Sequence, residues 1–159
     1  MKISIASDHA GFEQKQKLSQ YLREQGHDVR DMGPSDDSRV DYPDFAHRVA
    51  QEVANDAKHD KKRTGVLVCG TGIGMAIAAN KVPGIRAANV TTPEFAKLSR
   101  EHNDANVVTL SGRFVDLETN KSILDAFLST PFGAGRHAGR VEKITKIERE
   151  RGKETAGIS

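Results

Sequence analysis

The sequence predicts an α/β protein: a five-stranded parallel sheet with helices on both faces, which makes a three-layer sandwich. Short apolar runs alternate along the chain with longer segments in which apolar residues recur every three or four positions. These two patterns are typical of buried strands and of amphipathic helices. Glycine, proline and polar residues separate the segments, as turns require. Regular alternation of strand and helix favours a parallel sheet with right-handed crossovers.

The first half of the chain supplies three of the strands. Residues 3–7 are an apolar run, and the amphipathic segment 12–25 that follows it ends at a glycine, a common residue just past a helix C-terminus. Residues 29–32 form a weaker strand. A polar loop then leads to a helix that begins near Pro43. The clearest strand is 65–69, with the sequence Gly-Val-Leu-Val-Cys.

The second half supplies the last two strands and most of the helices. Residues 74–81 read as a short alanine-rich helix. Two apolar runs, 86–90 and 106–110, are strands on either side of a helix over 93–100. Residues 117–128 have helical periodicity and an apolar face, so they predict a helix.

Two segments lie beyond the sheet. Residues 140–151 predict an extra C-terminal helix, whose apolar residues recur at spacings of three. This stripe can pack on its own sheet or on a partner subunit. Residues 152–159 are polar, and we expect them to form a disordered tail. Because neither a linker nor a repeat interrupts the pattern, we expect residues 1–151 to form one domain.

The composition is that of an ordinary globular protein. The 159 residues are 36% hydrophobic and 29% charged, and 24 basic residues nearly balance 22 acidic ones. This balance argues against nucleic acid as a partner. Because no apolar run is long enough for a membrane span or a signal sequence, we expect a cytoplasmic protein with no membrane partner. The single cysteine excludes an intrachain disulfide.

Polar residues and glycines follow the strands at the place where ligands bind. In open parallel sheets, ligands bind beyond the carboxyl ends of the strands. The segments that follow the first, third, fourth and fifth strands are Asp8-His9, Cys69-Gly70-Thr71-Gly72-Ile73-Gly74, Thr91-Thr92 and Ser111-Gly112-Arg113. We expect these segments to converge at one edge of the sheet.

The glycine loop, residues 70–74, is the central signal. Its alternating glycines let the backbone approach a ligand, and unpaired amides at the start of a helix favour an anion or a developing oxyanion. Its G-x-G-x-G spacing does not fit the dinucleotide fingerprint, and neither Lys-Ser nor Lys-Thr follows it as in a Walker A loop. We therefore expect no cofactor. A tight turn without a ligand is the alternative reading.

Cys69 stands at the end of a strand and beside the start of a helix. The positive end of a helix favours a thiolate, which can act as a nucleophile or as a proton acceptor. A small buried core cysteine is the alternative. Position alone leaves the two readings equal.

A basic cluster stands near the start of the last helix. Arg136 and Arg140 are four residues apart, so they share a helix face, and His137 lies between them. The helix dipole disfavours positive charge there, and a bound phosphate would offset that cost. A solvated basic turn, partly balanced by Glu142, is the alternative. Arg113 is a further candidate for an anion ligand.

His102 and Asn103 end the helix before the fifth strand. A histidine there can serve as an acid or a base near neutral pH. Asp8 and His9 form a similar pair after the first strand. These residues could suggest a metal site together with Asp104, but no pair has a spacing typical of metal ligands, so we expect no metal.

Together, these motifs resemble the type B ribose-5-phosphate isomerases and their relatives, the galactose-6-phosphate and allose-6-phosphate isomerases. The resemblance covers residues 2 to 150. The matching segments, in order, are Ser7-Asp8-His9-Ala10-Gly11, Asp41-Tyr42-Pro43, Cys69-Gly70-Thr71-Gly72-Ile73-Gly74, Ala78-Ala79-Asn80-Lys81, Gly84-Ile85-Arg86-Ala87, His102-Asn103-Asp104-Ala105-Asn106 and Gly135-Arg136-His137 with Arg140.

The resemblance implies a Rossmann-like fold without a nucleotide, and a metal-independent aldose–ketose isomerisation through a cis-enediolate. Cys69 would take the proton from the carbon next to the carbonyl. Some members use a glutamate later in the glycine loop as the base, but Met75 stands there in this chain. Thr71 and the amides of the loop, including Gly70, Gly72 and Gly74, would hold the enediolate oxygens. His102 would help to open the furanose ring.

The resemblance also assigns the binding residues. Asp8 and Asn103 would bind sugar hydroxyls, and the phosphate would lie among His9, Arg113, Arg136 and Arg140, with His137 beside them. Some of these would come from a second subunit, since the family builds its site at a dimer interface. We expect a homodimer, and the sequence leaves open whether dimers pair into tetramers.

Three other functions remain open at this point. One is an allose- or galactose-6-phosphate isomerase, since the hexose and pentose phosphates differ by one hydroxymethyl unit. Another is a thiol enzyme with a histidine within hydrogen-bond reach of Cys69. The last is a non-catalytic module that binds sugar phosphates with the glycine loop and the arginines.

Overall fold

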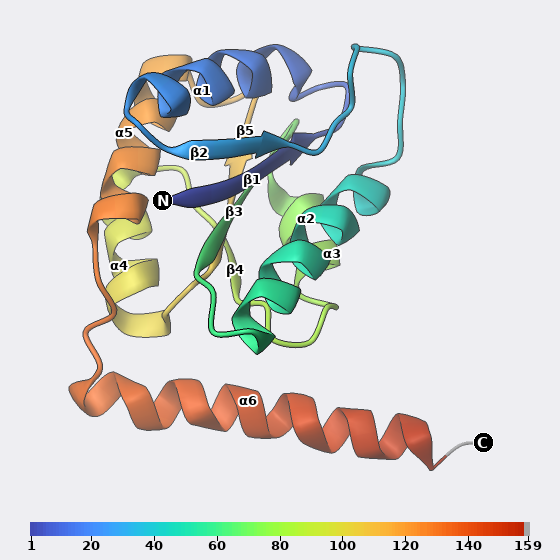
Figure 1. The fold of residues 1–159 in the computed structure, drawn as a ribbon, viewed down its shortest axis with the longest axis vertical. Coiled ribbons are helices and arrows are strands. Elements are labelled where there is room, and N and C mark those ends of the chain that lie inside the picture. The colour runs from blue at the N-terminus through green and yellow to red at the C-terminus, as the bar shows by residue number, and fades with distance from the viewer. Residues whose placement is uncertain (158–159) are drawn as a thin grey trace.

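A five-stranded parallel sheet forms the centre of the molecule (Figure 1). The structure is a computed structural model and describes residues 1–157. The strands lie in the order β2-β1-β3-β5-β4, and every neighbouring pair is parallel. Their bounds are β1 Lys2–Ser7, β2 Asp28–Asp31, β3 Arg63–Cys69, β4 Ala87–Asn89 and β5 Val107–Ser111. The α/β fold class and its five-stranded parallel sheet are therefore confirmed.

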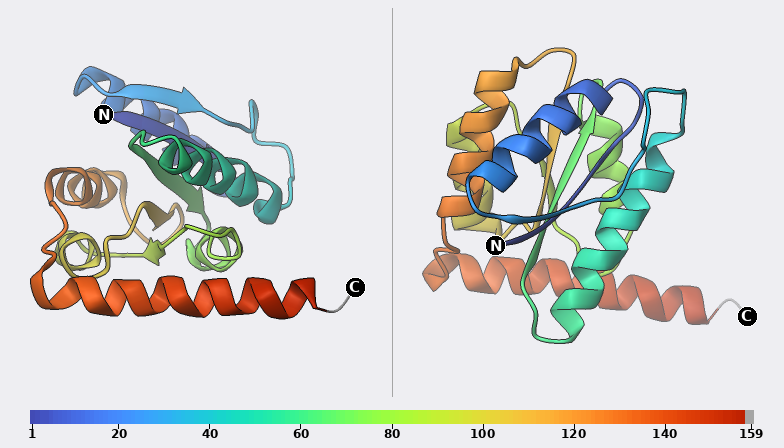
Figure 2. Two further views of the ribbon diagram at one scale, coloured as in Figure 1. Left: turned by 60° about the horizontal axis from the view of Figure 1, so that its bottom comes forward. Right: turned by 45° about the horizontal axis from the view of Figure 1, so that its top comes forward.

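Helices cover both faces of this sheet. Their bounds are α1 Phe12–Glu24, α2 Tyr42–Lys58, α3 Ile73–Ala79, α4 Pro93–Asn103, α5 Leu117–Ser129 and α6 Gly135–Ala156. One apolar core lies between the sheet and α1, α4 and α5, and a second lies between the sheet and α2 and α3. Helix α6 stands apart from these layers and crosses the end of the molecule, as both views of Figure 2 show.

Strand β3 shows how the sequence builds two cores at once. Successive side chains of a strand point to opposite faces. Val66 and Val68 therefore belong to the core with α1, α4 and α5, whereas Leu67 and Cys69 belong to the core with α2 and α3. A strand buried on both faces reads as a continuous apolar run. This is why the clearest strand in the sequence is also the central strand of the sheet.

The last helix differs from the sequence prediction at both ends. It begins at Gly135 rather than at residue 140, and it continues through residues 152–156, which were expected to be a disordered tail. Gly135, Gly139 and Gly152 lower the helix propensity of this segment, which hid its true length. His137 is buried near the start and fixes the first turn against the body. The last two residues of the predicted tail lie outside the described residues.

The loops at the carboxyl ends of β1, β3 and β5 converge, as predicted. The backbone amide of Asp8 donates to the carbonyl of Val68 at 3.1 Å, and the amide of Gly112 donates to the carbonyl of Cys69 at 2.8 Å. A side chain at Gly11 would lie 2.4 Å from the Val68 carbonyl oxygen, so only glycine permits this approach. Among residues 1–157, none of the helices is both long and apolar enough to cross a membrane.

Candidate active site

Cys69 is the last residue of β3 and lies at the floor of the converging loops. It is 5% exposed. The backbone amide of Gly72 donates a hydrogen bond to the Cys69 Sγ at 3.1 Å. A hydrogen bond of this kind stabilises a thiolate more than a thiol, since the donor meets a full negative charge. The sulfur thus lies within reach of a fixed backbone donor.

The glycine loop has the shape that its sequence predicts. Gly72 has a left-handed backbone, with φ of 82°, and a side chain on it would lie 2.4 Å from the Asn89 Oδ1. A side chain on Gly74 would lie 2.7 Å from the ring of Tyr42. Thr71 accepts a hydrogen bond from the amide of Ile73 through its Oγ1 at 3.2 Å. The remaining amides in the first turn of α3 have no intrahelical acceptor, which leaves them available to an oxyanion.

Asp8 and His9 extend the site from the end of β1. Asp8 is buried, and its Oδ1 accepts a hydrogen bond from the amide of Gly11 at 3.0 Å. The Nδ1 of His9 accepts one from the amide of Val40 at 3.3 Å. A neutral imidazole that accepts at Nδ1 carries its proton on Nε2. His9 can therefore donate to an anionic ligand.

Arg113 follows β5 and is tied to the glycine loop. Its backbone amide donates to the Gly70 carbonyl at 3.2 Å, and the Ser111 hydroxyl donates to the same carbonyl at 2.7 Å. The Arg113 side chain is exposed and passes beside Gly70. No ion pair with Arg113 forms within residues 1–157. We call Asp8, His9, Cys69, the glycine loop with Thr71, and Arg113 the strand-edge group.

The other predicted site residues form a second cluster, the α4–α6 group. It consists of His102 and Asn103 at the end of α4, and of Arg136, His137 and Arg140 at the start of α6. The rings of His102 and His137 stack with their centroids 4.3 Å apart. Burial, followed by the nearby positive groups, lowers the pKa of His137 below its ordinary value of 6.5. A neutral His137 can pack against His102 without charge repulsion.

The structure does not bring the two groups together within one chain. Helix α4 runs back from the end of β4, so His102 and Asn103 lie just before β5 begins, whereas Cys69 ends its strand. The seven residues of β3 span roughly 20 Å from the amino ends of the strands, where His102 and Asn103 lie, to the carboxyl ends, where Cys69 lies. This exceeds the length of a small sugar phosphate. One chain therefore holds the predicted site residues in two separate clusters.

Several residues near the site carry no role in the sequence interpretation. Tyr42 and Val40 line a cavity of about 500 Å³ with Asp8 and His9. The motif Asp41-Tyr42-Pro43 signals a helix start, and nothing in it reveals that the Tyr42 ring covers Gly74. We expected Thr91 and Thr92, which follow the fourth strand, to join the site. The Thr92 hydroxyl instead caps α4, where it accepts a hydrogen bond from the Phe95 amide.

The chemistry of the described residues narrows the alternatives. No histidine hydrogen-bonds to the Cys69 sulfur within residues 1–157, where the Gly72 amide is its partner. The thiol-enzyme hypothesis needs such a histidine and loses support. In the same part of the chain, no three His, Cys, Asp or Glu side chains are grouped as metal ligands would be.

A family model described as Ribose/Galactose Isomerase matches residues 3–144, which is most of the chain. The chain belongs to the ribose/galactose isomerase family. The predicted resemblance is thereby confirmed. Within this family, the ribose-5-phosphate isomerase B of Escherichia coli is 45% identical over 150 residues, covering 94% of this chain and 98% of that protein.

Solved structures of the family share the fold. The ribose-5-phosphate isomerase B of Clostridium thermocellum has a TM-score of 0.89 and 46% identity, over 95% of this chain and 99% of that one. The enzyme of Mycoplasma genitalium, solved with bound ribulose 5-phosphate, has a TM-score of 0.88 and 45% identity, over 94% and 97% of the two chains. The Rossmann-like arrangement is thus the fold of the family.

Proposed function

We propose that this chain is a metal-independent aldose–ketose isomerase that interconverts ribose 5-phosphate and ribulose 5-phosphate, with Cys69 as the base. The observation that carries the proposal is the hydrogen bond from the Gly72 amide to the Cys69 Sγ, beside the glycine loop. The family membership and the ribulose 5-phosphate bound to the Mycoplasma genitalium relative support the reaction and the substrate.

The chemistry needs a base and an oxyanion site on the same side of the sugar. The Cys69 thiolate takes the proton from C2 of the open aldose, so that an S–H bond forms and the C–H bond breaks. The electron pair makes the C1–C2 double bond, and O1 becomes the enediolate oxygen. A proton passes from O2 to O1, the C2–O2 carbonyl forms, and the proton held by the sulfur returns to C1, which gives the ketose and restores the thiolate. Amides of the glycine loop, with Thr71, hold the oxygens, and one such donor is typically worth about 3 kcal/mol.

Residues of both groups bind the sugar and the phosphate in this proposal. Asp8 from the strand-edge group and Asn103 from the α4–α6 group bind sugar hydroxyls, and His102 opens the ring. Guanidinium groups suit phosphate, and His9 offers its Nε2 proton. The phosphate therefore lies among His9, Arg113, Arg136, His137 and Arg140. Its remote binding energy orients the reacting carbons.

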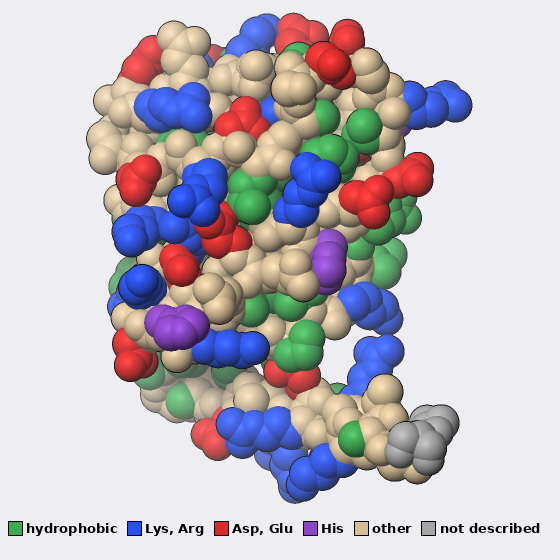
Figure 3. Space-filling view, turned by 45° about the vertical axis from the view of Figure 1, so that its right-hand side comes forward, with side chains coloured by type: hydrophobic (Ala, Val, Ile, Leu, Met, Phe, Trp, Pro, Cys, Tyr) green, Lys and Arg blue, Asp and Glu red, His purple; other side chains and the backbone are tan. Residues whose placement is uncertain are grey.

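A second copy of the chain completes the site in this proposal. The two half-sites of one chain lie at opposite ends of its strands, so the α4–α6 group of one copy must meet the strand-edge group of another. Contiguous apolar surface marks interaction sites on proteins, and several large apolar side chains are exposed in this structure. They include Ile73, Ile77, Phe95, Phe114, Ile144 and Ile147. A groove of about 930 Å³ between α6 and the edge strand β4, visible at one side in Figure 3, adds to this surface.

Turnover in the presence of EDTA and without nucleotide tests the reaction. We expect conversion of ribose 5-phosphate to ribulose 5-phosphate, and no effect of EDTA. Allose 6-phosphate and galactose 6-phosphate serve as comparisons. Turnover of a hexose phosphate alone would preserve the mechanism and change the substrate, since a pocket discriminates one such unit by only about 1–3 kcal/mol.

Replacement of the cysteine tests the base. We expect Cys69→Ala to lower turnover by roughly 10²-fold or more, because proton transfer by a positioned group contributes that much. Calorimetry should show nearly unchanged binding of ribulose 5-phosphate. A turnover rate close to that of the wild type would exclude Cys69 as the base and favour another residue.

Mixing of two inactive variants tests the shared site. Cys69→Ala removes one half-site and Arg140→Ala the other, so a mixed dimer keeps one intact site. If the two chains are co-expressed and pair at random, we expect about a quarter of wild-type activity, because half of the symmetric dimers are mixed. Two folded dimeric variants that recover nothing on mixing would contradict the shared site and leave the Cys69 result standing.

A further inference from the structure

We propose that Asp104 is a positioning residue for His102 and Asn103, and that it acts by clamping the end of α4 between two arginines. The inference deepens the proposed function, on which it rests. His102 and Asn103 are the part of the α4–α6 group that meets the sugar, and Asp104 follows them directly. It does not face the substrate itself.

The clamp is formed by two ion pairs to a single carboxylate. The Oδ1 of Asp104 lies 2.9 Å from the Nη1 of Arg100, and its Oδ2 lies 3.2 Å from the Nη2 of Arg86. Arg86 also donates through its Nε to the Asp104 backbone carbonyl at 2.8 Å. All three side chains are half-buried. The carboxylate thus joins the last turn of α4, which carries Arg100, to the segment before β4, which carries Arg86.

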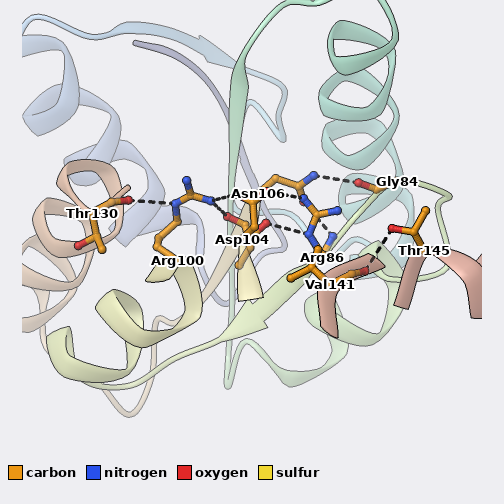
Figure 4. A network of polar contacts seen from close by, with 9 residues as sticks. Gly84, Arg86, Arg100, Asp104, Asn106, Thr130, Val141 and Thr145 are labelled. Atoms are coloured by element: carbon orange, nitrogen blue, oxygen red, sulfur yellow. Dashed lines mark hydrogen bonds and ion pairs between the residues drawn. The ribbon is translucent and has the colours of Figure 1, made fainter. Parts of the chain in front are cut away.

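The clamp extends to the neighbouring segments, as Figure 4 shows. Arg100 donates to the Ala105 carbonyl at 2.6 Å and to the Thr130 carbonyl at 3.3 Å. The amide of Arg86 donates to the Asn106 Oδ1 at 2.8 Å. The end of α4, the entries to β4 and β5, and the end of α5 are therefore held in one polar network. Charge-assisted hydrogen bonds of this kind are the stronger ones in proteins.

The backbone at Asp104 shows what the carboxylate adds. Asp104 has φ of 47° and ψ of 44°, the left-handed conformation in which helices often end. The amide of Ala105 donates to the Ser99 carbonyl at 3.0 Å, which completes this helix end. Glycine or asparagine would serve the backbone equally well or better. An aspartate here is explained by its contacts with Arg86 and Arg100.

The position of His102 depends on the direction in which α4 ends. Its ring stacks on His137, and the amide of Gly133 donates to the carbonyl of Glu101 at 2.9 Å, so α6 starts from the same place. A small rotation of the last turn would move the His102 ring and the Asn103 amide together. Misplacement of about 1 Å can cost about 10²-fold in rate.

Two substrates separate positioning from general damage. Ribose 5-phosphate must be opened from its ring before Cys69 can act on it. Ribulose 5-phosphate is always open, because its 5-hydroxyl is esterified. Exchange of its C1 hydrogen for deuterium in heavy water therefore needs Cys69 and the glycine loop, but not ring opening by His102. The exchange rate therefore reports on Cys69 and the glycine loop alone, whereas the turnover of ribose 5-phosphate also depends on His102.

The test compares Asp104→Asn and Asp104→Gly with the wild type at saturating substrate. We expect turnover of ribose 5-phosphate to fall about 10- to 100-fold, because ring opening loses its positioned group. Deuterium exchange at C1 of saturating ribulose 5-phosphate should stay within about twofold of the wild type, since this reaction does not need His102. Displacement of Asn103 weakens the binding of both sugars, so it should raise the KM for both. Both replacements suit the left-handed backbone, so the variants should fold.

Asp56→Asn is the matched control. Asp56 pairs with the Nε of Arg63 at 2.7 Å, is also half-buried, and has no contact with the α4–α6 group. Both of its rates should equal those of the wild type. Equal loss of the two rates in the Asp104 variants, or loss of neither, would overturn the positioning role. A wild type that performs neither reaction would instead overturn the proposed function, and this inference with it.

Discussion

Gly72 holds the sulfur of Cys69 with its own amide, and the conformation that permits this is open to glycine alone. The position has a positive φ of 82°, and the space beside it is filled by Asn89 and Leu110. Gly84 has a similar φ of 87°, yet its nearest neighbour is the Ala54 Cβ at 4.0 Å. Substitution of Gly84 by alanine therefore tests backbone strain alone, whereas the same substitution of Gly72 adds a steric collision.

We expect Gly84→Ala to lower the free energy of unfolding by about 1–2 kcal/mol, which is the cost of a left-handed alanine. Gly72→Ala should cost more and should also reduce turnover, because the amide is displaced from the Cys69 Sγ. Chemical denaturation and steady-state kinetics measure the two effects. Equal stability and equal activity of the two variants would mean that the loop yields easily at Gly72.

Lys15 is fully buried, and it anchors the loop that leads to the cavity beside His9. Its Nζ lies 2.9 Å from the Asp31 Oδ1 and 2.6 Å from the Pro34 carbonyl oxygen. We expect Asp31→Ala to lower the free energy of unfolding by about 3 kcal/mol or more, since it leaves a buried ammonium unpaired. Lys15→Met should cost less, because Asp31 is partly exposed and still accepts from the Gly33 amide. Urea denaturation gives the order, and the reverse order would contradict this account.

We expect His137 to make the stability of the protein depend on pH. Its pKa is lowered in the folded state, so the unfolded chain takes up a proton first as the pH falls. Stability should therefore decrease below about pH 6.5, the ordinary pKa of histidine. His27, whose pKa is also lowered by burial, acts in the same direction.

The variant His137→Asn isolates this contribution. Its loss of stability between about pH 7.5 and about pH 5.5 should be smaller than that of the wild type, because one proton uptake on unfolding is removed. The contribution of His27 is the same in both proteins and cancels. An unchanged pH dependence would show that His137 is protonated equally in both states.

At the residue scale, the sequence could predict what is local. Cys69, the glycine loop and Arg113 each follow a strand directly, so their place at one edge of the sheet follows from topology. The contacts of Lys15 with Asp31, and of Asp104 with Arg86, join separate elements, and no spacing announces them. A fully buried lysine also runs against the usual exposure of that residue.

At the scale of elements, the order of strands and helices was predictable because each buried strand reads as an apolar run. The boundaries of the elements were less predictable. Strand β4 has only three residues, at the sheet edge, and α6 begins five residues earlier than predicted. The early start of α6 could not be read from the sequence, because Gly135 and Gly139 are poor helix formers. It is set by contacts of His137 with α4.

Helix α6 contributes little to the core, and its removal should show this. The residues of both apolar cores lie between Ile3 and Phe127. We expect a chain that ends at Thr130 to keep its secondary structure, measured by circular dichroism, but to lose turnover, because Arg136, His137 and Arg140 are gone. The full chain with Arg136→Ala should lose turnover with its fold intact, as a control. An unfolded truncated chain would make α6 part of the folding unit.

At the scale of the whole molecule, the sequence could not separate the predicted site residues into two groups. The motifs appear in one list along the chain, and nothing in their order tells which edge of the sheet each one reaches. Only the return path of α4, with His102 and Asn103 at its end, places them away from Cys69. We expect light scattering to give twice the mass of one chain. A fully active monomer would contradict this.

The separation of the strand-edge group from the α4–α6 group also sets a condition on how copies would join in the proposed shared site. Each copy would offer two different surfaces, one with each group, and such surfaces link molecules into an endless row unless the pairing closes on itself. A two-fold arrangement closes after two copies and uses all four surfaces, so both sites form in the same event. On dilution, activity should then vanish with the square of the concentration of free chains, and no half-active state should precede its loss.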